Sequence, residues 1–253
     1  MYYKEWLMVR RSLFWFAVLV PAGWLTYAFV AFATNTTNDL VLDSWKQLLS
    51  WAVTLGAVAA TIFGSSLARE NDGHLELACT KPISRFRYAL GTLLVDMLGI
   101  AAVFAIVVIA VYVTLSLLAG HPLRLAAGTD SAWQLVRYCA APLAWFGLLT
   151  ALTARLRCQG ARLVIGLAWP VAIIIVVLGA VPLPPVMHSV FAFINLFNPI
   201  AASTIVQIDI ADSGVHAAAL QTAASFGLSF LVLGLFALGG PVAAALQWRR
   251  VEA

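Results

Sequence analysis

YALGTLLVDMLGIAAVFAIVVIAVYVTLSLLA, residues Tyr88–Ala119, is the segment that decides the fold class of this chain. Asp96 is its only charged residue, and the rest is apolar over a length that can cross a hydrocarbon layer about 30 Å thick. No water is present in such a layer to satisfy backbone N–H and C=O groups, so the segment must satisfy them itself. It therefore predicts a membrane-spanning α-helix.

Five other apolar runs make the same prediction elsewhere in the chain. With 62% hydrophobic and 10% charged residues and a mean hydropathy of +0.94, the sequence carries too much apolar surface for one soluble core. We predict a single all-α, polytopic transmembrane domain over residues 1–253, with six spans. The predicted spans are Leu13–Ala33, Trp45–Ala68, Tyr88–Ala119, Ala132–Arg155, Ala161–Val181 and Ala218–Gln247.

Basic residues are distributed unequally between the two sets of connecting segments. If both termini are cytoplasmic, 12 of the 15 Lys and Arg residues lie on the cytoplasmic side, which is where short basic loops remain. We expect a protein of the plasma (inner) membrane of a bacterium, with both termini in the cytoplasm. Contact with anionic membrane lipid then explains the pI near 9.2, and no nucleic acid partner is expected.

A charged segment, RENDGHLELACTKPISRFR at Arg69–Arg87, separates the second and third predicted spans. Asp72 or Gly73 can cap a short helix there, and Pro82 ends it after about two turns. The segment lies on the predicted cytoplasmic side and combines charged with apolar residues. We expect it to dock on a cytosolic partner through its apolar residues, which are Leu75, Leu77 and Ile83.

Residues 1–12, MYYKEWLMVRRS, are too polar to span a membrane. As a helix they would place Tyr3, Trp6 and Leu7 on one face, while Lys4 and the arginines that follow reach lipid head groups. We expect an interfacial helix that lies along the membrane surface. The alternative is an ordinary basic flank that anchors the first span.

Four small residues recur at every fourth position of the second predicted span and so share one helix face. Small side chains let another helix approach closely, which is how helices associate in lipid. Packing inside the chain and an interface between two copies both agree with this pattern. The four residues are Ala52, Gly56, Ala60 and Gly64.

Asp96 and Arg137 lie inside predicted spans, where ionisable residues are candidates for function. Asp96 is near the cytoplasmic side, and we favour an ion pair or helix contact over a proton relay, because no chain of ionisable groups is visible. Its candidate partners are Arg155, Arg157 and Arg162. We expect Arg137 to reach the outer interface or to pair with Asp130; contact with an anionic substrate is the alternative.

The segment between the fifth and sixth predicted spans, residues 182–217, is apolar but broken by four prolines. Its middle part, MHSVFAFINLFNPIAASTIVQ, is too short and too interrupted to cross a membrane. We expect one or two half-helices that dip into the outer leaflet as a lid. A surface loop with an apolar underside is the alternative.

No pattern typical of an enzyme site occurs in the sequence. It lacks the Gly-x-x-x-x-Gly-Lys-Ser/Thr loop that holds nucleotide phosphates, and its four histidines have no paired metal-ligand spacing. Its three cysteines fall on the predicted cytoplasmic side or in the membrane, which argues against a disulfide framework. We therefore expect no catalytic residue, metal or cofactor in this chain, and a partner as its source of energy. A six-helix membrane enzyme or assembly factor that works without an ATPase is the alternative.

The charged segment resembles the cytoplasmic loop of type-2 permeases of ATP-binding-cassette (ABC) exporters. That family shows an acidic residue, then Gly-Thr-Leu-Glu, two apolar residues and Pro-Val-Ser-Arg. The corresponding residues here are Glu70, Gly73-His74-Leu75-Glu76, Leu77-Ala78 and Pro82-Ile83-Ser84-Arg85. His74 replaces Thr and Ala78 replaces Leu. Lys4-Glu5 followed by Arg10-Arg11 is similar to the start of the family's interfacial elbow helix.

The resemblance implies the membrane subunit of an exporter, paired with a second copy or a paralogue. Two cytosolic ABC ATPase subunits would carry ATP and Mg, and the small-residue face would lie between the permease copies. Residues 1–12 would be the elbow, 69–87 a coupling helix and 182–217 the outer re-entrant helices; the exported substrate stays open. Residues assigned to ATPase coupling are Glu70, Gly73, His74, Leu75, Glu76, Leu77, Pro82, Ser84 and Arg85.

Overall fold

A computed structural model of the chain describes residues 3–34, 44–71, 84–120, 129–180, 184–195, 198–199, 201 and 230–250. The regular structure of these residues is helical, and no strand occurs among them. The long helices are α1 (Tyr3–Ala33), α3 (Ser44–Phe63), α6 (Arg85–Ala119), α7 (Thr129–Thr153) and α8 (Cys158–Ala180). The shorter ones are α4 (Ser66–Glu70), α9 (Pro185–Asn195), the π-helix η1 (Leu235–Gly239) and α12 (Gly240–Trp248).

Five helical stretches in the described chain are long and apolar enough to cross a membrane. They lie in α1, across α3 and α4, in α6, in α8 and over Phe230–Trp248. The all-α class is thereby confirmed, with helices suited to a membrane-embedded protein. The fourth predicted span falls on α7, whose apolar part is shorter, Tyr138–Thr153, so the count of six spans stays a prediction.

α6 is the longest helix, and both of its ends have a local cause. Ser84 precedes it in an extended conformation, and its Oγ accepts a hydrogen bond from the backbone N–H of Arg87 at 3.3 Å. Gly120 follows it with φ of 70°, a left-handed conformation that favours glycine and ends the helix. Its buried residues recur at intervals of three and four, so one face of α6 is turned to the bundle.

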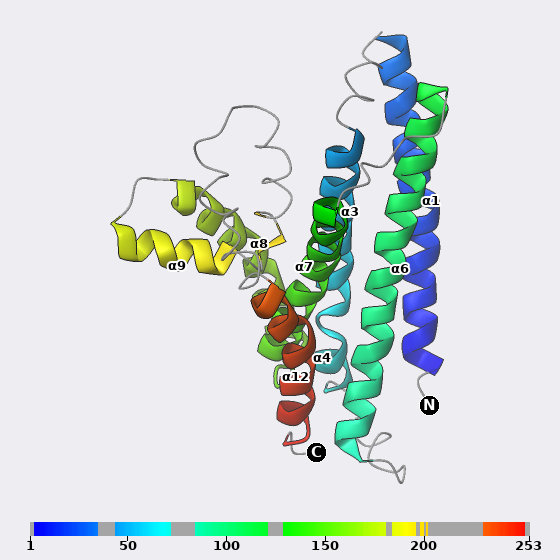
Figure 1. The fold of residues 1–253 in the computed structure, drawn as a ribbon. Helices are drawn as coiled ribbons and strands as arrows, with labels where there is room; N and C mark the ends of the chain where they lie inside the picture. Colours follow the sequence, from blue (N-terminus) through cyan, green and yellow to red (C-terminus); the bar gives the residue numbers. More distant parts are fainter. Residues whose placement is uncertain are drawn as a thin grey trace.

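α6 also occupies the centre of the bundle, where it packs against α1, α3, α7 and α12. In Figure 1, α1, α3, α6 and α7 run nearly side by side, while α8 leans away and α9 lies across the direction of the bundle. α1 begins and α12 ends at the same end, which is the lower one in Figure 1. We call it the basal end.

Residues 3–12 do not form a separate helix. α1 runs without interruption from Tyr3 to Ala33, so the expected interfacial helix is instead the beginning of α1. Val9 is buried there, and its side chain lies against Gly99 of α6. This contact holds the start of α1 on the bundle, as expected for a flank that continues the first span.

The small-residue face of α3 packs inside the chain. A Cβ added to Gly56 would lie 2.9 Å from Cγ of Pro142, and one added to Gly64 would lie 2.9 Å from Cβ of Leu149. Both neighbours belong to α7. Ala52 and Ala60 of the same face are fully buried. Close approach of α7 therefore accounts for the two glycines, and the burial of the two alanines shows that they also pack inside the chain.

Thr61 is a polar link between three helices. Its Oγ1 accepts hydrogen bonds from the indole N–H groups of Trp145 in α7 and Trp169 in α8, each at 3.1 Å. The same hydroxyl donates to the carbonyl of Ala57 at 2.7 Å. One hydroxyl group on α3 thus satisfies two indole donors that would otherwise have no polar partner in an apolar bundle.

α7 and the final helical stretch approach more closely than side chains would allow. A Cβ on Gly240 would lie 2.5 Å from the backbone of Gly147, and a Cβ on Gly147 would collide with the carbonyl of Phe236. Phe236 belongs to η1, so the π-helix lies at this crossing. The obstacles are backbone atoms, which cannot rotate aside, and both positions therefore require glycine.

Gly147→Ala is expected to lower the thermal midpoint of the detergent-solubilised protein, with a cost of about 1–3 kcal/mol, because the added methyl group forces α7 and η1 apart. Gly234→Ala is the matched control, since a Cβ at Gly234 would meet nothing within 4 Å. This control should be neutral or slightly stabilising, because alanine is the better helix former. Equal midpoints for the two variants would contradict the close contact.

Candidate functional site

Buried polar side chains gather at the basal end of the bundle, where α4 meets the starts of α1 and α6. Burying polar groups in a membrane-embedded bundle is costly, so such a concentration is a candidate site. We call this group the basal cluster. Its members are Glu5, Ser66, Arg69, Glu70, Tyr88, Thr92 and Asp96.

α6 presents three members of the basal cluster on one face. Tyr88, Thr92 and Asp96 follow each other at intervals of four residues, so they lie one above another along the helix. Thr92 and Asp96 are buried, and Tyr88 is partly buried. The start of α1 adds the buried Glu5.

A break between α3 and α4 brings the remaining members to the site. Thr153 of α7 donates a hydrogen bond from Oγ1 to the carbonyl of Gly64 at 2.7 Å, inside the break. This bond satisfies a carbonyl group at the end of α3, where the helical hydrogen-bond pattern stops. α4 then places Ser66, Arg69 and Glu70 beside α6.

Asp96 is fully buried among Glu5 of α1 and Ser66 and Arg69 of α4, which all act on it electrostatically. No donor in the described part of the chain meets hydrogen-bond geometry at either of its carboxylate oxygens. Nη2 of Arg69 lies 4.0 Å from Oε1 of Glu5, too far for a hydrogen bond. Asp96 therefore has charged neighbours without a direct hydrogen bond.

The expected partners of Asp96 were wrong. The three arginines proposed from the sequence are exposed at the junction of α7 and α8. Their place is taken by Arg69, because the break after α3 turns α4 toward α6. The exposed arginines are Arg155, Arg157 and Arg162.

Tyr88 connects the basal cluster to the last helix. Its hydroxyl group hydrogen-bonds with the carboxylate of Glu70. Its ring stacks on the indole of Trp248, with ring centroids 5.8 Å apart and an interplanar angle of 26°. Glu70 is buried, so in this structure its carboxylate faces Tyr88 and is not presented to a cytosolic partner.

Asn71, the residue directly after α4, joins three helices at the basal end. Its Nδ2 donates to the carbonyl of Ala154 at 3.1 Å and to that of Leu156 at 2.8 Å, just beyond the end of α7. Its Oδ1 accepts a hydrogen bond from the indole N–H of Trp248 in α12 at 2.8 Å. All hydrogen-bonding atoms of the amide group are thus used to hold α4, α7 and α12 together.

The other predicted site residues fall in different places. Ser84 caps α6, and Arg85 is the first residue of that helix. Arg137 lies in α7, and its side chain is outside what the structure describes. Also outside the described residues are Gly73, His74, Leu75, Glu76, Leu77 and Pro82.

Sequence reasoning missed Asn71 and Trp248 as residues that link helices at the basal end. Asn71 stands in a charged segment and gives no periodic signal, because its partners are backbone carbonyl groups far along the chain. Trp248 directly precedes Arg249 and Arg250, a context typical of an interface anchor. That context locates the end of the helix but does not indicate the bond to Asn71.

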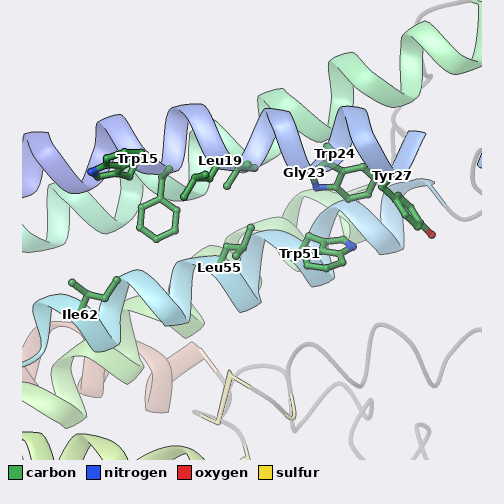
Figure 2. Close-up of a pocket in the computed structure, with 10 residues that line it drawn as sticks. Trp15, Leu19, Gly23, Trp24, Tyr27, Trp51, Leu55 and Ile62 are labelled. Atoms are coloured by element: carbon green, nitrogen blue, oxygen red, sulfur yellow. The ribbon is translucent and has the colours of Figure 1, made fainter. Parts of the chain in front are cut away.

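A groove of about 540 Å³ lies between α1 and α3, and both helices contribute side chains to it (Figure 2). Trp24 contacts Tyr27 and Trp51 edge to face at one end, with ring centroids 5.5 Å and 5.9 Å apart. The walls are aromatic and aliphatic, so lipid chains fit them better than polar ligands. The lining residues are Trp15, Phe16, Leu19, Val20, Gly23, Trp24, Tyr27, Trp51, Leu55 and Ile62.

The described residues contain no group of three or more His, Cys, Asp or Glu side chains that could hold a metal ion. The basal cluster therefore offers charged and hydrogen-bonding side chains that lie between helices.

No protein-family model matches the chain, and no curated protein matches it either.

Asn71→Ala is expected to lower the free energy of unfolding by about 2–3 kcal/mol, because it removes three hydrogen bonds and leaves the buried partners Ala154 and Trp248 unsatisfied. Chemical denaturation in detergent measures this change. Combined with Trp248→Phe in a double-mutant cycle, it should show a coupling energy of about 0.5–1.5 kcal/mol.

Thr26→Val is the matched control for the Asn71 substitution, because Thr26 bonds only within α1, to the carbonyl of Ala22. It should change stability little. Additive effects of Asn71→Ala and Trp248→Phe would show that the two side chains do not depend on each other.

Proposed function

We propose that this chain is the membrane-embedded permease subunit of an ABC-type exporter. Separate cytosolic ATPase subunits would bind ATP and Mg and supply the energy. The resemblance of the segment Arg69–Arg87 to the cytoplasmic loop of type-2 permeases supports this proposal. The structural observation that carries it is the position of Asn71, at the start of that segment, on three helices of the bundle.

Both ends of residues 72–83 are attached to the bundle. At one end Asn71 is bonded to α7 and α12, and at the other Ser84 begins α6. A force applied to this segment by a partner therefore reaches α4, α6, α7 and α12 together. Packed helices respond to such a force by moving as bodies, because their interfaces are dense and deform little.

Pairing of two permease copies would use a surface other than the small-residue face of α3, since α7 covers that face. α1 and α8 have the least buried membrane-crossing stretches, 17% and 11%, and so have the most surface left for a second copy or for lipid. The groove between α1 and α3 has part of its lining on α1 (Figure 2).

The basal end would face the cytoplasm, because α1 begins and α12 ends there and because Asn71 and Ser84, which flank the basic segment, lie at the ends of α4 and α6 that belong to it. α9 would then form part of the outer lid. It is a helix of 11 residues beside α8, too short to cross a membrane. Asn198 follows it and donates from Nδ2 to the carbonyl of Ala172 in α8 at 2.9 Å.

Leu75→Asp and Glu76→Lys are expected to abolish co-purification of ATPase activity with the affinity-tagged chain from its native membrane, because they alter the surface proposed to dock on the ATPase. Gln159→Lys is the control, since Gln159 is exposed at the start of α8, outside the coupling segment. All three variants should keep the thermal midpoint of the unmodified protein. Absence of ATPase activity from the unmodified chain would refute the proposed function.

A cysteine at Ser189 in α9 should react with a membrane-impermeant maleimide in intact cells, and one at Arg250 should react only after lysis. Both positions are exposed and lie toward opposite predicted sides of the membrane. The native Cys79, Cys139 and Cys158 are first replaced by serine. Labelling of the Arg250 variant in intact cells would reverse the proposed orientation.

A further inference from the structure

We infer that Glu5 and Asp96 form a binding site for one proton, which their two carboxyl groups hold between them beside Arg69. The site joins three elements, because Glu5 belongs to α1, Arg69 to α4 and Asp96 to α6. It goes beyond the proposed function, and it depends neither on an ATPase partner nor on transport.

Two carboxyl groups lie close together at this site and one of them is fully buried. Asp96 is 0% exposed and Glu5 is 7% exposed, and the two carboxyl groups interact with each other. Arg69 is the cation that acts on Asp96 among the described residues, and its side chain is 34% exposed. Two adjacent carboxylates in a buried site do not both remain charged, because repulsion adds to the cost of removing each from water. One proton held between the two carboxyl groups removes this repulsion.

Hydrogen bonding leads to the same result. A charged carboxylate can only accept hydrogen bonds, and the nearby hydroxyl group of Ser66 does not reach hydrogen-bond geometry at either oxygen of Asp96. Buried polar atoms in proteins are rarely left without a partner. A proton on Glu5 or Asp96 converts one acceptor into a donor, so the two carboxyl groups can hydrogen-bond to each other.

The surroundings limit which other groups take part. Ser66 and Arg69 face the pair from α4. Along α6, Tyr88 interacts with both Glu5 and Glu70, so a third carboxylate lies at the cluster's edge. One turn beyond Asp96 the environment is apolar, since Gly99 meets Val9 of α1 and Phe63 of α3.

A proton fits this site better than a metal ion. Mg²⁺ and Ca²⁺ require about six or more oxygen ligands, and the site offers two carboxyl groups and one hydroxyl. The positive guanidinium of Arg69 would also repel a metal cation at this site. A proton can instead be shared between the two carboxyl groups in a hydrogen bond.

Loss of the proton would place two like charges between α1 and α6. Repulsion would then loosen the start of α1, which Val9 otherwise holds against Gly99. The docking of α1 on the bundle is therefore linked to proton binding, and it weakens as the pH rises.

Infrared difference spectroscopy of the full chain in phosphatidylcholine nanodiscs tests the site directly. Titration between about pH 5 and pH 9 should reveal the carbonyl stretch of a buried protonated carboxylic acid, shifted in D₂O. Glu5→Gln and Asp96→Asn should each abolish this band. Asp39→Asn, on the connection between α1 and α3, is the control and should retain it.

Thermal unfolding provides a second measurement. The folded chain holds a proton that the unfolded chain releases at neutral pH, so the midpoint of the unmodified protein should fall as the pH rises, by at least about 2 °C. Glu5→Gln and Asp96→Asn should remove this fall, because one carboxylate remains to face Arg69.

Two results would overturn the inference. One is the absence of the carboxylic acid band from the unmodified protein at every pH, a result that does not require any variant to fold. The other is a band that persists in both Glu5→Gln and Asp96→Asn.

Discussion

Packing against α6 is the interaction on which the rest of the bundle depends. α6 contacts α1, α3, α4, α7 and α12, and its buried residues form one continuous face along the helix. Lipid is as apolar as the helix surfaces, so the hydrophobic effect does not drive helices together in a membrane. Their positions therefore depend on close fit and on hydrogen bonds between them. The face that provides this fit also carries Asp96 and Thr92, and the basal cluster is therefore held in place by the core itself.

Polar side chains add direction to this apolar packing. Thr61, Thr153 and Asn71 each bond to a helix distant in the sequence, and these bonds are buried or partly buried in the bundle. A single bond of this kind contributes only about 1 kcal/mol, but leaving its buried partner unsatisfied costs more. These contacts consequently select one arrangement of helices among the many that apolar surfaces alone would permit.

Apolar length was sufficient to predict where α6 lies: the predicted span ends at Ala119 as the helix does and begins three residues inside it. The break before Ser66 was not predictable, since the second apolar run continues through it and the bond from Thr153 arrives from α7. The partners of Asp96 were missed for the same reason. Periodicity reports how one helix meets an apolar surface, whereas the basal cluster depends on three segments whose relative positions the sequence does not state.

The π-helix Leu235–Gly239 has a consequence for the register of the last helix. A π turn contains one residue more than an α turn, so the residues after it are rotated by roughly a quarter turn relative to an unbroken α-helix. η1 meets α7, whereas α12 meets both α7 and α6. This rotation brings Trp248 onto Tyr88 and Asn71. The number of residues in the π turn therefore determines the direction in which the indole of Trp248 points. An insertion or deletion in that turn would displace this ring at the other end of α12.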